Sequence, residues 1–181
     1  AALVGIDTVY HCAALAGAPG SVEEYEKANV GGTIRLATLA AEAGVRTFVY
    51  VSSISVYAMP QGSPWLDENS AYDTRAVERG AYTQSKLGAD RAILEFASTH
   101  ATPRIVVLRP GTIYGPGVKL PLGRFPMPIP LGARPIVAGD GRVPMPLTYV
   151  DNVIDAMRLG AVRDLPNGRV FNIIDEPELD Q

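Results

Sequence analysis

Apolar residues gather in short runs along the chain, and these runs predict the strands. They occupy residues 7–11, 47–51, 105–108 and 170–174, and they are rich in β-branched and aromatic side chains. Runs of this length and composition are typical of buried strands, because a parallel sheet is covered on both faces. We therefore expect four strands, the first three separated by segments long enough to hold a helix.

A helical spacing of apolar residues follows the first strand. Within residues 22–43, one face of the expected helix carries Val30, Ile34, Ala37 and Ala41. Ser21 and Glu24 stand three residues apart at its start and predict a capping box. Gly44 is a typical terminator. Residues 82–97 and 151–161 predict two more helices.

The order of these elements indicates the fold class. Strand, helix, strand, helix, strand, joined by segments long enough for right-handed crossovers, describes half of a doubly wound sheet. Proline and glycine are frequent between residues 115 and 146, so few regular elements are expected there. We predict an α/β protein with a partial Rossmann-like doubly wound parallel sheet in residues 1–114. Residues 115–181 form a loop-rich, partial substrate-binding region with a returning helix and strand.

Composition excludes several classes of function. Hydrophobic residues make up 47% of the chain, which predicts a packed core. The net charge is −3 and no basic run is present, so neither nucleic acid nor a membrane is expected as a partner. A single cysteine excludes an internal disulfide framework and, with no signal-peptide pattern at the start, indicates a cytoplasmic protein. No ligand spacing predicts a metal site.

The most chemically informative residues are Tyr82 and Lys86. Four residues apart on a helix, they share one face, where an ammonium can lower the pKa of a phenol. The pattern alone is common by chance, but this pair opens a helix that follows the strand ending in Ser52 and Ser53. Ligands bind at the carboxyl ends of strands in such sheets. Together these residues indicate hydride-transfer chemistry on a carbinol or carbonyl, with Tyr82 as general acid or base.

Six blocks in order resemble the extended short-chain dehydrogenases/reductases, which include NAD-dependent sugar epimerases, dehydratases and 3β-hydroxysteroid dehydrogenases. The blocks are residues 11–14 (HCAA), 29–33 (NVGGT), 51–57 (VSSISVY), 82–86 (YTQSK), 109–116 (RPGTIYGP) and 149–153 (YVDNV). The resemblance implies that Tyr82 is the catalytic acid/base and that Lys86 lowers its pKa while binding the nicotinamide ribose. It also implies that Ser53 is the catalytic serine.

The same resemblance implies an NAD or NADP site and places further residues along it. Those at the cofactor are Cys12, Ala13, Ala14, Asn29, Ser52, Tyr82, Lys86, Pro110 and Gly111. The alternative interpretation of Ser52 is a purely structural role. The alternative interpretation of Asn29 is an amide on the helix surface. His11 is expected to be structural, and Cys12 to be a small buried residue without nucleophilic function.

Three residues are candidates for a small-molecule substrate: the resemblance implies Ser53 and Thr112, and the chemistry of a guanidinium suggests Arg142. Thr112 stands where typical sugar-nucleotide members have asparagine, which weakens that substrate assignment. Arg142 is equally well explained as a phosphate-binding fork or as a solvated loop arginine. Ile54 and Ser55 replace the acidic residues that follow the catalytic threonine in dehydratases, so dehydration is disfavoured.

Residues 1–30 lack the glycine-rich turn that holds the cofactor pyrophosphate in this family. The residue that separates NAD from NADP is missing too, and we expect an internal fragment that lacks both ends and is inactive by itself. The complete protein is expected to be a homodimeric epimerase or dehydrogenase acting on a sugar nucleotide or related alcohol. The alternative is a non-catalytic NAD(P)-binding regulator of the same fold.

Overall fold

The computed structural model describes residues 2–58, 66–117 and 146–175, and its centre is one parallel sheet. The four strands are β1 (Thr8–His11), β2 (Thr47–Val51), β3 (Arg104–Pro110) and β6 (Arg169–Ile173). They lie in the order β1-β2-β3-β6 and every neighbouring pair is parallel. Each strand lies where the apolar runs predict it, with bounds that differ by two residues at most.

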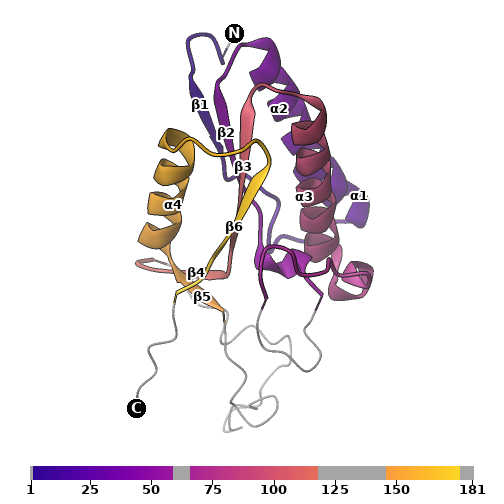
Figure 1. Ribbon diagram of the computed structural model, residues 1–181. Coiled ribbons are helices and arrows are strands. Elements are labelled where there is room, and N and C mark those ends of the chain that lie inside the picture. Colours follow the sequence, from indigo (N-terminus) through magenta and orange to yellow (C-terminus); the bar gives the residue numbers. More distant parts are fainter. Residues whose placement is uncertain (1, 59–65, 118–145, 176–181) are drawn as a thin grey trace, which may run out of the picture.

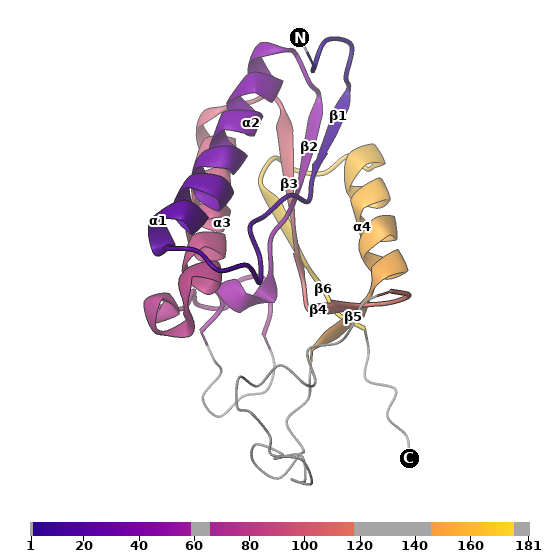
Figure 2. The same cartoon turned by 180° about the vertical axis from the view of Figure 1, so that it is seen from behind.

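Helices cover both faces of this sheet. On one face lie α1 (Val22–Tyr25), α2 (Gly32–Glu42) and α3 (Ala81–Thr99), and on the other lies α4 (Val150–Val162), as Figures 1 and 2 show from opposite sides. The predicted doubly wound α/β arrangement is therefore confirmed. Among the described residues, no helix is both long and apolar enough to cross a membrane.

The two-residue period of the strands divides the core into two layers. Phe48 and Tyr50 of β2 pack in the layer under α2 and α3, while Val49 between them packs with Val106 under α4. These side chains are almost completely buried. Burial of each one contributes about 1.5–3 kcal/mol, so the layers hold the strand ends in fixed positions.

The predicted helix of residues 22–43 is present, but its winding is not uniform. A π-helical turn, Glu26–Gly31, separates α1 from α2. The capping box of Ser21 and Glu24 is formed as predicted, and Gly44 follows the last turn with a φ of +74°. A π turn widens the helix by one residue per turn and often marks a functional position. Here it contains Asn29.

The alanine-rich helix faces pack on the sheet. The apolar layer that contains Phe48 also contains Ala37, Ala40 and Ala89, which are fully buried, and the partly buried Ala41. These alanines therefore allow α2 and α3 to approach the strands closely.

A second, two-stranded sheet was not expected from the sequence. It pairs β4 (Thr112–Tyr114) with β5 (Leu147–Tyr149) in parallel. Gly111 connects it to β3 at a point of very close approach, because a Cβ atom there would lie 2.3 Å from the carbonyl oxygen of Pro146. Glycine is the residue that fits this position. Arg142 and most of the proline-rich segment lie outside the described residues.

Candidate functional site

The carboxyl ends of β1, β2 and β3 lie at one edge of the parallel sheet, toward the lower end in Figure 1. Ser53 follows the end of β2, and Tyr82 stands in the first turn of α3. Both side chains are half-buried. Two residues with 28 others between them in the chain are therefore brought to one edge, as the sequence predicts.

Ser53 and Tyr82 influence each other directly. Ser53 begins a short 3₁₀ turn, Ile54–Val56, and its Oγ accepts a hydrogen bond of 3.1 Å from the backbone N–H of Ser55. Burial raises the pKa of the Tyr82 phenol, while hydrogen bonding with the Ser53 side chain acts in the opposite direction. The two hydroxyl groups lie at the same edge of the sheet, an arrangement suited to holding and protonating one substrate oxygen.

Lys86 is held by two acceptors on strand β2. Its Nζ donates hydrogen bonds to the carbonyl oxygen of Val51 at 2.8 Å and to the hydroxyl of Tyr50 at 3.1 Å. The ammonium is thus directed toward β2, and burial raises the pKa of Tyr82. Sharing a helix face brings two side chains near each other, but strand β2 supplies the acceptors that decide where this ammonium points.

The protonation state of Lys86 is itself altered by burial. Its side chain is 3% exposed, and burial lowers its pKa to about 8, while the charges of Asp90 and Cys12 act in the opposite direction. A lysine with this pKa is still mostly protonated at neutral pH. It therefore brings a positive charge to the strand ends under physiological conditions.

Asn29 fixes the strip of small residues that follows β1. Its Nδ2 donates to the hydroxyl of Ser85 at 2.9 Å and to the carbonyl oxygen of Leu15 at 3.1 Å. Its Oδ1 accepts from the backbone N–H of Leu15 at 2.6 Å. Asn29 is 1% exposed, so its interpretation as a helix-surface amide is wrong. The π turn directs its side chain inward, between the strip and α3.

Cys12, Ala13 and Ala14 begin this strip, and all three are exposed at the end of β1. The expectation that Cys12 is buried is therefore wrong. Desolvation still raises the pKa of its thiol, against a smaller opposing effect of Lys86, so the thiol is not activated as a nucleophile. The exposed backbone of small residues suits close approach of a ligand.

His11 has the structural role that the sequence predicts. It is 8% exposed, its Nε2 lies 2.9 Å from the hydroxyl of Thr33, and its ring stacks on that of Tyr50. Burial, and to a smaller extent the charge of Lys86, lowers the pKa of the imidazole. His11 therefore stays neutral near pH 7.

A buried ion pair behind the site was missed by the sequence reasoning. Arg109 binds Asp90 through two hydrogen bonds, Nη2 to Oδ1 at 2.6 Å and Nε to Oδ2 at 3.0 Å. Tyr72 also donates to Asp90 at 2.7 Å, and Arg109 donates to Tyr57 at 2.6 Å. The available signal was the position of Asp90, four residues after Lys86 on the same face of α3.

This ion pair explains Ser52. The Ser52 hydroxyl donates to Asp90 at 2.5 Å, and the residue is 4% exposed. Its side chain therefore belongs to the buried pair, in line with the structural alternative, and it does not point toward a ligand. Of the two neighbouring serines, Ser52 is buried and Ser53 is only half-buried.

Pro110 and Gly111 close the site at the end of β3. Pro110 is buried, and the N–H of Gly111 is hydrogen-bonded to the carbonyl oxygen of Ile173 and to the hydroxyl of Thr148. Thr112 is half-buried, and its backbone N–H donates to the carbonyl oxygen of Pro146 at 2.7 Å. These backbone groups hold the turn in shape. No group of residues with metal-binding geometry occurs in the described part of the chain.

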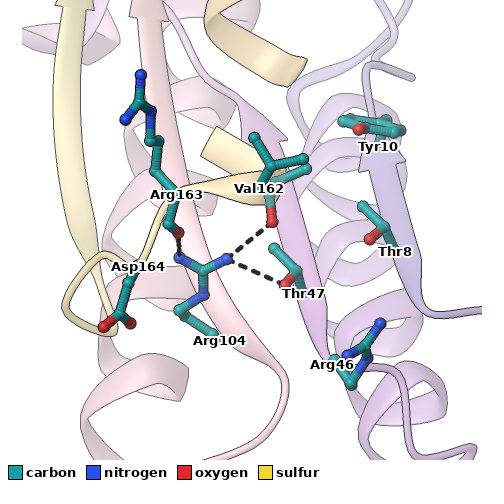
Figure 3. A pocket seen from close by; sticks show the side chains of 9 residues that line it. Thr8, Tyr10, Arg46, Thr47, Arg104, Val162, Arg163 and Asp164 are labelled. Carbon is teal, nitrogen blue, oxygen red and sulfur yellow. Dashed lines mark hydrogen bonds between the residues drawn. The ribbon is translucent and has the colours of Figure 1, made fainter. Parts of the chain in front are cut away.

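A separate hollow of about 470 Å³ lies at the opposite end of the sheet, where the strands begin (Figure 3). Arg104 crosses it and donates to the carbonyl oxygen of Ala161 at 3.0 Å and to the hydroxyl of Thr47 at 3.2 Å. Its guanidinium thus caps the carboxyl end of α4. The hollow is remote from Ser53 and Tyr82 and does not contribute to their chemistry.

The chain is similar to proteins of one family. Residues 1–173 match the model of the NAD dependent epimerase/dehydratase family. A sterol-4-alpha-carboxylate 3-dehydrogenase of Candida albicans is 32% identical over 94% of this chain and 49% of its own length. A 3 beta-hydroxysteroid dehydrogenase/isomerase of Mycobacterium tuberculosis is 31% identical over 93% of this chain and 46% of its own length.

Solved structures agree with this similarity. MoeE5 in complex with UDP-glucuronic acid and NAD superposes with a TM-score of 0.74 at 32% identity, over 95% of this chain and 57% of that protein. The chain spans about half the length of the curated relatives that it matches. The fold and the order of the conserved elements are therefore shared over nearly the whole described chain.

Proposed function

The chain belongs to the NAD-dependent epimerase/dehydratase family, and from this premise we propose that it carries the acid/base groups of an NAD-dependent epimerase or dehydrogenase. The substrate group is a hydroxyl or keto group of a sugar nucleotide or a related alcohol. The placement of the half-buried Ser53 and Tyr82 at the same strand ends supports this function most directly. Lys86 stands one turn further along α3.

In this proposal Ser53 holds the substrate oxygen and Tyr82 moves the proton. Burial raises the pKa of Tyr82, so its phenol is protonated at neutral pH and suited to donate to a keto oxygen. In the oxidative direction the Tyr82 phenolate accepts the hydroxyl proton, and the charge of Lys86 one turn away favours that anion. An epimerase uses both directions in one cycle, whereas a dehydrogenase releases the oxidised product.

The residues at this edge fit the nicotinamide end of an NAD molecule, whereas residues 1–30 lack the glycine-rich turn for its pyrophosphate. NAD supplies the acceptor for the hydride that leaves the substrate carbon. The exposed strip that begins with Cys12 allows close backbone approach, and Pro110 ends β3, which lies on the other side of β2 from β1. Lys86 has three N–H donors, of which two are used by Tyr50 and Val51, so the third is free to bind a ribose hydroxyl.

The relatives support two substrate classes. One is named a sterol carboxylate dehydrogenase, and MoeE5 binds a UDP-sugar. Thr112, in place of the asparagine of typical sugar-nucleotide members, favours the broader description as an alcohol. A homodimer in the cytoplasm completes the proposal, supported by the family resemblance and by the single cysteine.

A non-catalytic NAD-binding regulator is the competing function. It would need the strip at β1 and Lys86 but not the paired hydroxyls of Ser53 and Tyr82. Cofactor binding without turnover, over a broad panel of alcohols and sugar nucleotides, would favour the regulator.

The decisive variant is Tyr82→Phe in the complete protein. Loss of the phenolic hydroxyl removes the proton transfer and should lower kcat by about 10²- to 10⁴-fold. Binding of NAD, measured by calorimetry with NADP as a comparison, should stay within about threefold, because a single neutral hydroxyl is lost.

Tyr10→Phe is the matched control, because Tyr10 is 45% exposed and lines the hollow at the other end of the sheet. It should leave kcat unchanged. Normal turnover of the Tyr82→Phe variant would reject the proposed mechanism.

A further inference from the structure

Strand β2 holds the ammonium of Lys86. Two acceptors lie within hydrogen-bond distance of Nζ: the carbonyl oxygen of Val51 at 2.8 Å and the hydroxyl of Tyr50 at 3.1 Å. Tyr50 is 1% exposed and Lys86 is 3% exposed. A buried ammonium is strongly destabilised unless its donors are satisfied, so these two oxygens determine where it can lie.

Tyr50 is itself held firmly in place. The alternation of β2 directs it to the layer under α2 and α3, where it packs with Phe48. Its ring stacks on His11 with centroids 5.6 Å apart, and His11 is fixed by Thr33, whose hydroxyl donates to the carbonyl oxygen of Asn29 at 2.6 Å. Tyr50 therefore offers Lys86 an acceptor whose position is set by β1, β2 and the π turn together.

The Tyr50 phenol is also fixed in its neutral form. Burial, followed by the charge of Asp90, raises its pKa well above the usual range. A phenol that stays neutral can accept a hydrogen bond from an ammonium at every pH at which the fold is stable. Sequence reasoning did not single out Tyr50, because it reads as one more aromatic residue of a buried strand.

We propose that Tyr50 is a positioning residue for Lys86: its hydroxyl, held by the stack with His11, orients the ammonium so that the remaining N–H faces the cofactor site. The inference rests on the proposed function, in which Lys86 binds the cofactor ribose. Tyr50 acts through Lys86 and does not contact the reacting atoms.

The proposal predicts a change in Lys86 that a purely packing role would not cause. The ionisable groups that act on Lys86 are Asp90 and Cys12, and His11 lies on the same side. Tyr50→Phe leaves all three in place and keeps the ring. It removes one of the two oxygens that stabilise the charged form, so the pKa of Lys86 should fall below its value of about 8.

The experiment observes Lys86 directly in the complete protein. Lysine labelled at Cε and Nζ reports the titration by NMR without cofactor, and the Lys86 signal is assigned by its loss in Lys86→Arg. In Tyr50→Phe the midpoint should move to lower pH. The alkaline limb of activity should move with it, and kcat/KM for NAD should fall by about 10- to 100-fold, as expected for one charged hydrogen bond.

Tyr57→Phe is the matched control. Tyr57 is also 1% exposed and loses the same hydroxyl in this variant. That hydroxyl is hydrogen-bonded to Arg109 and Asn172 and has no bond to Lys86. The titration of Lys86 in the Tyr57→Phe variant should be unchanged. An unchanged midpoint in Tyr50→Phe, or an equal shift in both variants, overturns the proposal.

The two proposals can fail separately. If Tyr82→Phe retains turnover while Tyr50→Phe shifts the Lys86 titration, the proposed mechanism fails and the positioning role stands. If Tyr82→Phe is inactive and Tyr50→Phe titrates normally, the positioning role alone is rejected. Near-UV circular dichroism confirms that each phenylalanine variant keeps its packed core.

Discussion

Individual side chains at the strand ends owe their properties to what buries them. The carboxylate of Asp90 is fully buried, and it accepts hydrogen bonds from Arg109, Ser52 and Tyr72. Such a pair contributes little net stability compared with apolar packing, but removal of one partner leaves the other charge unpaired in the core. The ion pair therefore fixes the geometry behind Ser53.

Asp90→Asn should test this dependence. It leaves the Arg109 guanidinium without its counter-charge, so the free energy of unfolding should fall by about 3–5 kcal/mol in urea titrations. Asp155→Asn is the control, because Asp155 pairs with Arg158 on the surface, with side chains 68% and 74% exposed. That variant should lose no more than about 0.5 kcal/mol. Similar losses in both variants would contradict the role assigned to burial.

Sequence reasoning brought Ser53 and Tyr82 to one edge of the sheet, but it did not identify the acceptors that hold Lys86. Helical spacing gives the face on which a side chain starts, and this was sufficient to bring Tyr82 to the strand ends. The end point of a long flexible side chain depends on acceptors supplied by other elements. Val51 and Tyr50 are such acceptors, and their position relative to Lys86 is a tertiary property.

At the scale of elements, the turn at Gly111 joins the large sheet to the small one. Its N–H is hydrogen-bonded to Ile173, so the backbone cannot move away from Pro146. A side chain at this position would therefore meet the Pro146 carbonyl at a distance that no real contact allows.

Gly111→Ala should accordingly lower the free energy of unfolding by about 1–3 kcal/mol, as overpacked sites do. Gly32→Ala is the control, since a Cβ atom at Gly32 has no neighbour within 4 Å and the residue lies in a helix. That substitution should stabilise the protein by about 0.5–1 kcal/mol. Chemical denaturation measures both, and a neutral Gly111→Ala would show that the turn can relax.

The long elements were predictable and the short ones were not. Strands β2 and β3 are continuous apolar runs because both of their faces are covered. Strands β4 and β5 have three residues each, and they pair across a stretch of chain that carries no period. The π turn at Glu26–Gly31 has an ordinary helical composition, so the sequence predicts a uniform helix there.

At the scale of the whole molecule, the strands of the large sheet differ in how well they are shielded from solvent. Strands β2 and β3 lie at the centre of the sheet between helices, whereas β1 lies at its edge, where Tyr10 is 45% exposed. In the 181-residue chain, local opening should therefore cost less at β1 than at β2 and β3.

Hydrogen exchange followed by mass spectrometry should reveal this order. The backbone amides of β2 and β3 should exchange most slowly, at rates set by global unfolding, and those of β1 should exchange faster. The comparison of β1 with β2 within one sample is its own control. Equal protection of both strands would mean that the edge is as stable as the centre.

The π turn has a consequence for how the chain tolerates length changes. The extra residue in this turn changes the angular position of the side chains around the helix axis. As a result, Ala37 and Ala40 of α2 stay on the sheet while Asn29 faces Ser85. Deletion of a single residue from Glu26–Gly31 would restore regular winding and rotate the preceding turn by about 100°. The helix would remain intact, yet the strip along β1 would lose its anchor. A one-residue deletion here would therefore disturb the same sheet edge that carries Ser53 and Tyr82.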